Sequence, residues 1–149
     1  MNDFIRFHEN DSFLKRSVEA RSRLLLLLRD FFGDRGFLEV ETPIVCSSPG
    51  VEVHLAALET RVARRTMYLT TSPEFHMKRL VAVGFERIFQ VTRAFRDGER
   101  GDLHNPEFTM VEWYRKGEDH LAIMEDCEEL IAHLSRGLSG GTMAPARDG

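Results

Sequence analysis

Two long apolar segments, rich in β-branched and aromatic residues, lie on either side of a polar stretch. The segments cover residues 87–96 and 107–114, and the stretch between them, residues 97–106, contains glycine. Segments of this composition predict strands, and a polar stretch with glycine predicts the loop that joins them. We therefore expect a long β-hairpin, and with it an antiparallel sheet.

Alternation along the second strand divides its side chains between two faces of the sheet. One face carries Phe108, Met110, Glu112 and Tyr114, and the other carries Thr109, Val111 and Trp113. On the first strand we expect Arg96 at the loop end, on the same side as Ile88, Gln90, Thr92 and Ala94, with Arg93 on the opposite face. One face of the hairpin thus combines an aromatic ring, a carboxylate and a phenol.

Glu112 lies in the middle of an otherwise apolar strand. Burying a carboxylate costs on the order of several kcal/mol unless a cation or hydrogen bonds compensate it. Glu112 is therefore expected to have a positive partner. An internal salt bridge to Arg93, Arg96 or Arg115 would supply one, and so would a cationic ligand, and the residues alone leave both open.

Residues 17–35 predict the first helix, because apolar residues recur at helical spacing before Gly36. Five consecutive leucines, residues 24–28, make its middle apolar on nearly every side. One stripe is expected to face the sheet. Another needs a second cover, either from the same chain or from a partner subunit.

Shorter elements are predicted between the first helix and the hairpin, and one more follows it. Residues 37–43, 51–58 and 67–71 predict strands in an antiparallel arrangement, with a solvated turn at 62–66. Ser72, Pro73 and Glu74 suit the start of a helix that ends at Gly84. A final amphipathic helix is expected to bury a stripe formed by Leu121, Met124, Ile131 and Leu134. Residues 1–136 are expected to form one domain, followed by a disordered tail, 137–149.

Composition narrows the class of protein. The 149 residues carry a net charge of −4, which does not favour general binding to nucleic acids or anionic membranes. The two cysteines form no metal-binding or disulfide pattern, and no apolar run is long enough to span a membrane. We therefore expect a cytoplasmic protein with no membrane association.

Three segments together resemble the class II lysyl-tRNA synthetases: GFLEVETP, TSPEFHMKRL and FQVTRAFRDGERGDLHNPEFTMVEWYR. The resemblance covers roughly residues 12 to 135. It implies an α+β fold, in which helices flank an antiparallel sheet. Residues 17–43 look like the first class II signature, which builds a homodimer interface in that family, and residues 93–114 look like the second.

Details within these segments look more like the elongation factor P lysine ligases than the tRNA-charging enzymes. They are the stretches 52–55, 72–79 and 112–115. About a dozen residues precede Phe13, which leaves no room there for an anticodon-binding domain, so tRNA is a weaker expectation. The resemblance implies ATP-dependent activation of lysine or β-lysine as an adenylate, followed by transfer to a lysine of elongation factor P.

The resemblance also assigns roles to individual residues. Arg96 would be catalytic, holding the ATP α-phosphate and the carboxylate of the amino acid. Glu74 would bind the α-amino group of the substrate, and Glu112 and Tyr114 its side-chain ammonium. ATP contacts would come from Arg96, Glu99, His104 and Phe108. Mg²⁺ would bridge the ATP phosphates, but its family ligands lie later in the fold, so no metal ligand is assigned in this chain.

The sequence departs from the family pattern at several points. Gly98 stands where the second signature has glutamate, with Glu99 one place later, and Asp102 replaces a usual basic residue. The glycine-rich third signature has no counterpart in residues 135–149. The fold is therefore expected to be incomplete and the chain alone to be weakly active. Two alternatives stay open: a fragment of a lysine-tRNA ligase, and a non-catalytic binding protein related to the synthetases.

Overall fold

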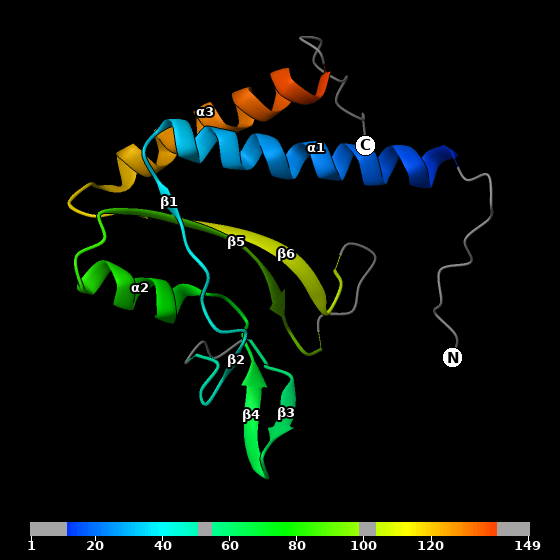
Figure 1. Cartoon of the computed structure of the whole chain (residues 1–149), viewed down its shortest axis with the longest axis vertical. Coiled ribbons are helices and arrows are strands. Elements are labelled where there is room, and N and C mark those ends of the chain that lie inside the picture. The colour runs from blue at the N-terminus through cyan, green and yellow to red at the C-terminus, as the bar shows by residue number, and fades with distance from the viewer. Residues whose placement is uncertain (1–11, 51–54, 99–103, 140–149) are drawn as a thin grey trace. The chain divides into compact units, whose positions relative to one another are not determined.

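A computed structural model describes residues 12–50, 55–98 and 104–139 of the chain (Figure 1). The described residues fall into two compact units. The first combines helices from both ends of this part of the chain, and the second is the continuous segment Arg35–Asp119. Among the described residues, no helix is both long enough and apolar enough to cross a membrane.

The first unit consists of two helices, α1 (Ser12–Asp34) and α3 (His120–Ser139), which pack against each other. The ring of Phe31 contacts the rings of Phe32 and His133, at centroid distances of 5.1 and 5.7 Å. The helices approach closely at Gly137, where an added Cβ would lie 2.5 Å from Cδ1 of Leu27. A side chain at position 137 would therefore force the Leu27 side chain to shift.

The structure corrects the predicted bounds and buried face of these helices. α1 begins at Ser12, five residues before the predicted start, and α3 continues to Ser139, past the predicted end of order at Arg136. The stripe expected to be buried on α3 is largely exposed: Leu121 60%, Met124 55% and Ile131 68%. The helix instead packs through Leu130, His133 and Gly137, one face at i, i+3 and i+7, where glycine lets α1 come closest. Residues 140–149 of the predicted tail lie outside the described residues.

The main sheet of the second unit has the order β1 (Leu38–Glu39), β5 (Arg87–Phe95) and β6 (Glu107–Arg115). The antiparallel hairpin of β5 and β6 confirms the prediction from the two apolar segments. The predicted faces are confirmed as well, because Glu112 pairs with Gln90, and residues directly opposite share a face. β1 runs parallel to β5, so the sheet is mixed, not wholly antiparallel as predicted.

A second sheet contains β2 (Val45–Cys46), β4 (Arg65–Leu69) and β3 (Glu59–Val62), in that order. A two-residue turn joins β3 to β4, with φ of 48° at Ala63 and 67° at Arg64. The predicted strand at 51–58 is wrong in its described part, which forms only an isolated bridge between Ala56 and Asp97; residues 51–54 lie outside the description. The turn predicted at 62–66 has only two residues in the structure. The strand predicted at 67–71 corresponds to β4, which begins and ends two residues earlier.

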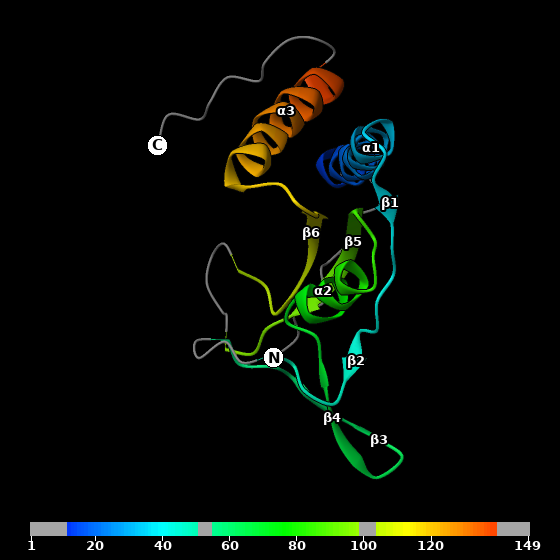
Figure 2. The ribbon, with the colours of Figure 1, turned by 90° about the vertical axis from the view of Figure 1, so that its left-hand side faces the viewer.

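The helix α2 (Glu74–Ala82) contacts β5 and β6 and lies over one face of the main sheet, as Figures 1 and 2 show. The predicted start at Ser72, Pro73 and Glu74 is confirmed, and the helix ends before Gly84 as expected. Pro73 and Met77 are fully buried and anchor its first turn. α2 thereby brings its polar residues to the face of the sheet that carries Glu112.

Candidate functional site

Ser72 is held rigidly at the junction between the two sheets. The neighbouring Thr70 donates its amide to the Ile44 carbonyl (2.8 Å), and its own carbonyl accepts the Phe95 amide (2.9 Å). Thr70 and Pro73 are buried. The position of Ser72 is therefore fixed by backbone bonds and packing on both sides.

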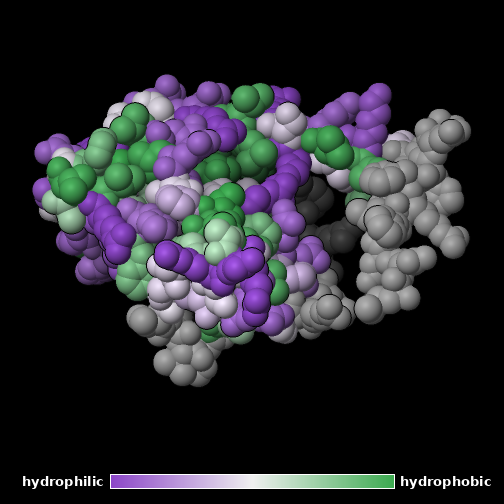
Figure 3. Space-filling view, turned by 60° about the horizontal axis from the view of Figure 1, so that its bottom comes forward, coloured by the Kyte–Doolittle hydropathy of each residue, from purple (hydrophilic) through white to green (hydrophobic). Residues whose placement is uncertain are grey.

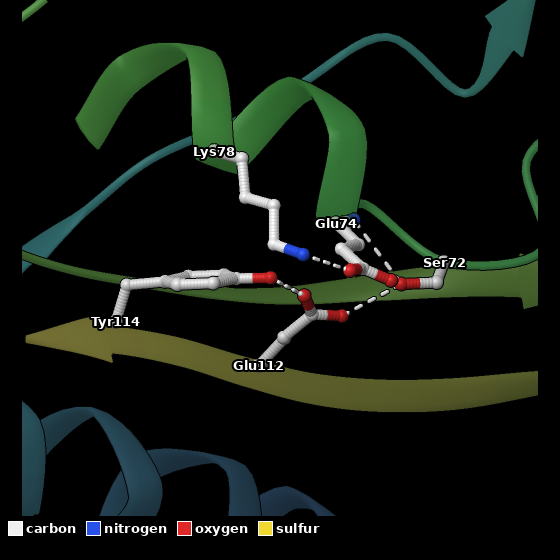
Figure 4. Close-up of polar contacts among 5 residues, drawn as sticks. All are labelled: Ser72, Glu74, Lys78, Glu112 and Tyr114. Atoms are coloured by element: carbon white, nitrogen blue, oxygen red, sulfur yellow. Dashed lines mark hydrogen bonds and ion pairs between the residues drawn. The ribbon is translucent and has the colours of Figure 1, made fainter. Parts of the chain in front are cut away.

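The Ser72 hydroxyl connects α2 to the carboxylate of Glu112. Its Oγ accepts the backbone N–H of Glu74 (3.1 Å) and donates to Oε2 of Glu112 (2.7 Å). Since the Glu74 amide occupies a lone pair of the hydroxyl, the hydroxyl proton is directed at Glu112. The start of α2 and the middle of β6 are joined by this one side chain, as Figure 4 shows.

Tyr114 holds the other oxygen of the same carboxylate. Its hydroxyl donates to Oε1 of Glu112 (2.6 Å), which is possible because residues two apart on a strand share a face. Burial raises the pKa of Tyr114 far above its usual value, and the hydrogen bond to Glu112 and the charges of Glu112 and Glu74 raise this pKa further. Tyr114 therefore stays protonated and acts as a donor at neutral pH.

Neutral donors hold Glu112, and no arginine neutralises it. Within the described part of the chain, its side chain makes no ion pair. Two of the three candidate arginines form ion pairs elsewhere: Arg93 with Glu107 (3.4 Å) and Arg115 with Glu118 (3.4 Å). The internal salt bridge left open by the sequence is therefore not formed, and the negative charge of Glu112 remains available.

A second carboxylate lies beside the first and does have a cation. Glu74, in the first turn of α2, forms an ion pair with Lys78 one turn later. Glu74 raises the pKa of Lys78 through this hydrogen bond and through its charge, and the charge of Glu112 adds a smaller contribution. The cluster of Ser72, Glu74, Lys78, Glu112 and Tyr114 (the carboxylate cluster) therefore contains two carboxylates and one ammonium.

The residues predicted to contact ATP lie at the loop end of the hairpin. The guanidinium of Arg96 lies over the ring of Phe108, 5.0 Å from its centroid, and the Arg96 amide donates to the Pro106 carbonyl (2.9 Å). His104 is exposed, and Glu99 lies outside the described residues. Phe108 and Glu112 share a face of β6, with a separation of about 13 Å along the strand at the usual rise per residue.

The structure thus brings together Glu74, Glu112 and Tyr114 and, separately, Arg96 and Phe108. Sequence reasoning assigned no substrate role to Ser72 or Lys78. The Ser-Pro-Glu start of α2 was visible, but only as a capping pattern. Lys78 follows Glu74 by four residues, a spacing at which opposite charges on a helix meet, so this pair could have been predicted.

A separate hollow of about 440 Å³ lies on the other side of α2. Its lining includes Val45 and Cys46 of β2 with Phe75, His76 and Arg79 of α2. Burial raises the pKa of the Cys46 thiol, while a backbone hydrogen bond from Ser48 lowers it by a smaller amount. Hydrophobic and hydrophilic groups are interspersed on the face of the molecule drawn in Figure 3. None of the five residues of the carboxylate cluster lines this hollow.

Metal ligation was tested on the described residues. No group of three or more His, Cys, Asp or Glu side chains in them is placed to hold a metal ion. The carboxylate cluster has two acidic side chains, and one of them is paired with an ammonium. Its donors and charges suit an amine better than Mg²⁺, which prefers several oxygen ligands in an octahedral arrangement.

Comparison with known proteins identifies the family to which this chain belongs. The family model of class II tRNA synthetases (D, K and N) matches residues 3–145. This match covers nearly the whole chain, so the chain belongs to that family. The resemblance based on the three sequence segments is thereby confirmed.

Several similar curated proteins carry the name elongation factor P–(R)-β-lysine ligase. The chain is 44% identical to the one from Hamiltonella defensa over 120 residues, 76% of this chain and 37% of that protein. It is 44% identical to the one from Vibrio cholerae over 125 residues, 80% and 39% of the two chains. For Yersinia enterocolitica the identity is 43% over 120 residues, 76% and 37%. The chain therefore spans less than two fifths of the length of these relatives.

Proposed function

We propose that the carboxylate cluster binds lysine or β-lysine. Glu112 and Tyr114 would bind the side-chain ammonium, and Glu74 the other amino group of the substrate. The observation that carries this proposal is the state of Glu112, which two hydroxyl donors fix in position without neutralising its charge. Because Glu112 is half-buried and the partial removal of an unneutralised carboxylate from water is costly, a cationic ligand is the partner that this arrangement favours.

Hydrogen-bonding capacity supports an amine as that ligand. An ionised carboxylate offers about four lone-pair sites. Each Glu112 oxygen accepts one hydroxyl proton, so each keeps room for a further donor. An ammonium group has three N–H donors and no acceptor, and it can bond to such a carboxylate at short range. The same site would bind an uncharged or acidic side chain poorly.

The reaction proposed for the site is formation of an aminoacyl-adenylate. A carboxylate oxygen of the substrate attacks the α-phosphorus of ATP, the bond to the β-phosphate oxygen breaks, and pyrophosphate leaves. Arg96 would hold the α-phosphate and the substrate carboxylate, which brings the reacting atoms together and offsets the developing charge. Phe108 would stack on adenine, and His104 and Glu99 would contact ATP from the loop. Mg²⁺, when bound, would neutralise the leaving pyrophosphate.

The acceptor proposed for the activated amino acid is a lysine side chain of elongation factor P. Its amine nitrogen would attack the acyl carbon, an amide would form, and AMP would leave. The names of the relatives support this acceptor over tRNA. We also propose a cytoplasmic location and a homodimer formed through residues 17–35, where exposed apolar side chains such as Val18 and Leu26 lie on α1.

Ligand binding to the 149-residue chain, measured by calorimetry, tests the proposal. Glu112→Gln should weaken the binding of lysine and of (R)-β-lysine by about 10- to 100-fold, because a hydrogen bond to a charged group contributes about 1.5–3 kcal/mol. The affinity for ATP should stay within about twofold. Arg96→Ala should have the opposite effect, because it should weaken the affinity for ATP more than the affinity for lysine.

Two matched variants control for general effects of charge. Glu86→Gln changes an exposed carboxylate of the same unit, and Arg93→Ala removes an exposed arginine from the opposite face of β5. Both should bind lysine and ATP like the unmodified chain. If the unmodified chain binds no lysine or β-lysine, or if Glu112→Gln weakens lysine and ATP equally, the proposed site is wrong.

A further inference from the structure

Lys78 reaches into the carboxylate cluster from α2, at the place where an amino group of the substrate would bind. We propose that Lys78 is a positioning residue. Its ammonium pairs with the Glu74 carboxylate while no substrate is bound, and one amino group of the substrate replaces it when the substrate binds. The inference rests on the proposed function, since it assumes that the ligand is a diamino acid. It adds a residue to which neither the family nor the relatives' names assign a role.

The Lys78 ammonium lies where an ammonium of the substrate would bind, at the end of an exposed side chain. Its side chain is 59% exposed and is anchored only at its tip, by the ion pair with Glu74, whose side chain is 34% exposed. Figure 4 shows the ammonium directed toward the Glu74 carboxylate, on the side of the cluster where Glu112 and Tyr114 lie. The stem can therefore turn toward solvent without disturbing the buried residues of α2.

The two carboxylates of the cluster differ in what a ligand must displace. Glu112 is held by hydroxyls and forms no ion pair with another described residue, so an ammonium can bind it with no exchange of partners. Glu74 is already paired, so an ammonium must replace Lys78 there. An exposed ion pair is worth about 0–1 kcal/mol, so the exchange is cheap and reversible.

The charge of the cluster supports the replacement of Lys78 at Glu74 by an ammonium of the substrate. With Lys78 in place, the two carboxylates and one ammonium sum to a net charge of about −1. Once Lys78 has turned away, two carboxylates face the two ammonium groups of a diamino acid. A ligand with only the side-chain ammonium would use Glu112 and leave the Lys78–Glu74 pair intact. Lys78 therefore affects the affinity for the amino group at Glu74 more than for the one at Glu112, to which its ammonium is coupled only through charge.

Two ligands that differ by one amino group separate these contributions. L-lysine carries both ammonium groups, and 6-aminohexanoate lacks the α-amino group. Calorimetric titration of the complete chain with each ligand should show that Lys78→Met tightens lysine binding about two- to fivefold, the range that an exposed ion pair allows. Binding of 6-aminohexanoate should tighten by a smaller factor than binding of lysine, because it meets Lys78 only through the weaker coupling with Glu112. Lys78→Arg keeps a competing cation and should behave like the unmodified chain.

Lys15→Met is the matched control, because it removes an exposed helical lysine that lies on α1. It should leave both ligands unaffected, and Lys78→Gln should reproduce Lys78→Met. Equal tightening of both ligands would overturn the proposal in favour of a general charge effect. Weaker lysine binding would overturn it in favour of a lysine that orders Glu74. Absence of lysine binding to the unmodified chain would instead overturn the proposed function, and this inference with it.

Discussion

Glu112 is fixed by hydroxyl groups from two different parts of the chain. Tyr114 is its neighbour on the strand, so alternation alone predicted that the two side chains would be adjacent. Ser72 precedes Glu112 by 40 residues, and no local pattern links them. The sequence therefore predicted which face carries the site and that Glu112 requires compensation, but not that a serine from the α2 start provides part of it.

Tyr114 should make the stability of the second unit depend on alkaline pH. Its pKa is raised in the folded chain, so the native state holds the proton more tightly than the unfolded state. The stabilisation is fully present below pH about 10, the usual tyrosine pKa, and is lost as the pH rises, at up to about 1.4 kcal/mol per unit. Tyr114→Phe should remove this part of the loss, as measured by urea unfolding at pH 9, 10.5 and 11.

The comparison with the other tyrosine isolates the effect. Tyr68→Phe leaves the Tyr114–Glu112 bond intact and should retain the alkaline loss that Tyr114 causes. Tyr114→Phe should also be less stable at pH 7 by about 1 kcal/mol, the usual value of one hydrogen bond. The same alkaline slope in the Tyr114→Phe chain as in the unmodified chain would contradict this role.

Single elements show which sequence patterns are informative. The hairpin β5–β6 was predictable because both strands are rich in apolar, β-branched and aromatic residues and a polar stretch with glycine joins them. The turn between β3 and β4 was predicted at 62–66, but its two-residue length was not, since two-residue turns with positive φ usually contain Asn or Gly, whereas this one contains Ala63 and Arg64. The parallel pairing of β1 with β5 was missed, because β1 has only two residues and carries no signal for its direction.

The helix α3 was predicted too short because the residues after Arg136 include almost no large apolar side chain. In the structure, Gly137 lies inside the helix, where its missing side chain makes room for Leu27 of α1. A glycine in a helix costs about 1 kcal/mol relative to alanine, so its presence there reflects a packing requirement. Contact with a residue 110 positions away decides this, and local propensity does not show it.

Gly137→Ala should therefore destabilise the first unit. Its new Cβ would meet Leu27 at 2.5 Å, and such overpacking costs about 1–3 kcal/mol against a gain of about 1 kcal/mol in helix propensity. We expect a net loss of about 1 kcal/mol in chemical unfolding. Gly33→Ala is the matched control, because Gly33 is in α1 with nothing within 4 Å, and it should stabilise. Equal stabilisation by both substitutions would contradict the close approach of the helices.

At the scale of the whole molecule, contacts divide the described residues into two units, whereas composition predicted one domain. A division of this kind depends on pairing between distant segments. The α1–α3 pair joins two helices that are separated by the entire second unit. Neither helix carries a local pattern that identifies the other as its partner.

The proposed homodimer would form through residues 17–35 of the first unit. Leu26→Glu places a charge at an apolar position of α1 that is 59% exposed. Burying an unpaired charge in the interface costs on the order of several kcal/mol, so the Kd of the dimer should rise at least about tenfold. Sedimentation velocity over a range of concentrations measures the shift. Val83→Glu places the same charge at an apolar position directly after α2 that is 76% exposed, and it should have no effect. A purely monomeric unmodified chain would rule out the dimer.

The separation of α1 from α3 has a consequence for the order of synthesis. A ribosome adds about 5–20 residues per second, so the roughly 85 residues between the two helices take about 4–17 s to emerge. During that interval the leucine-rich helix has no α3 to cover it, whereas the second unit, one continuous segment, can fold as soon as it is complete. The nascent chain thus exposes the run of five leucines in α1 throughout that interval, and this run is where a chaperone that binds apolar segments would act first.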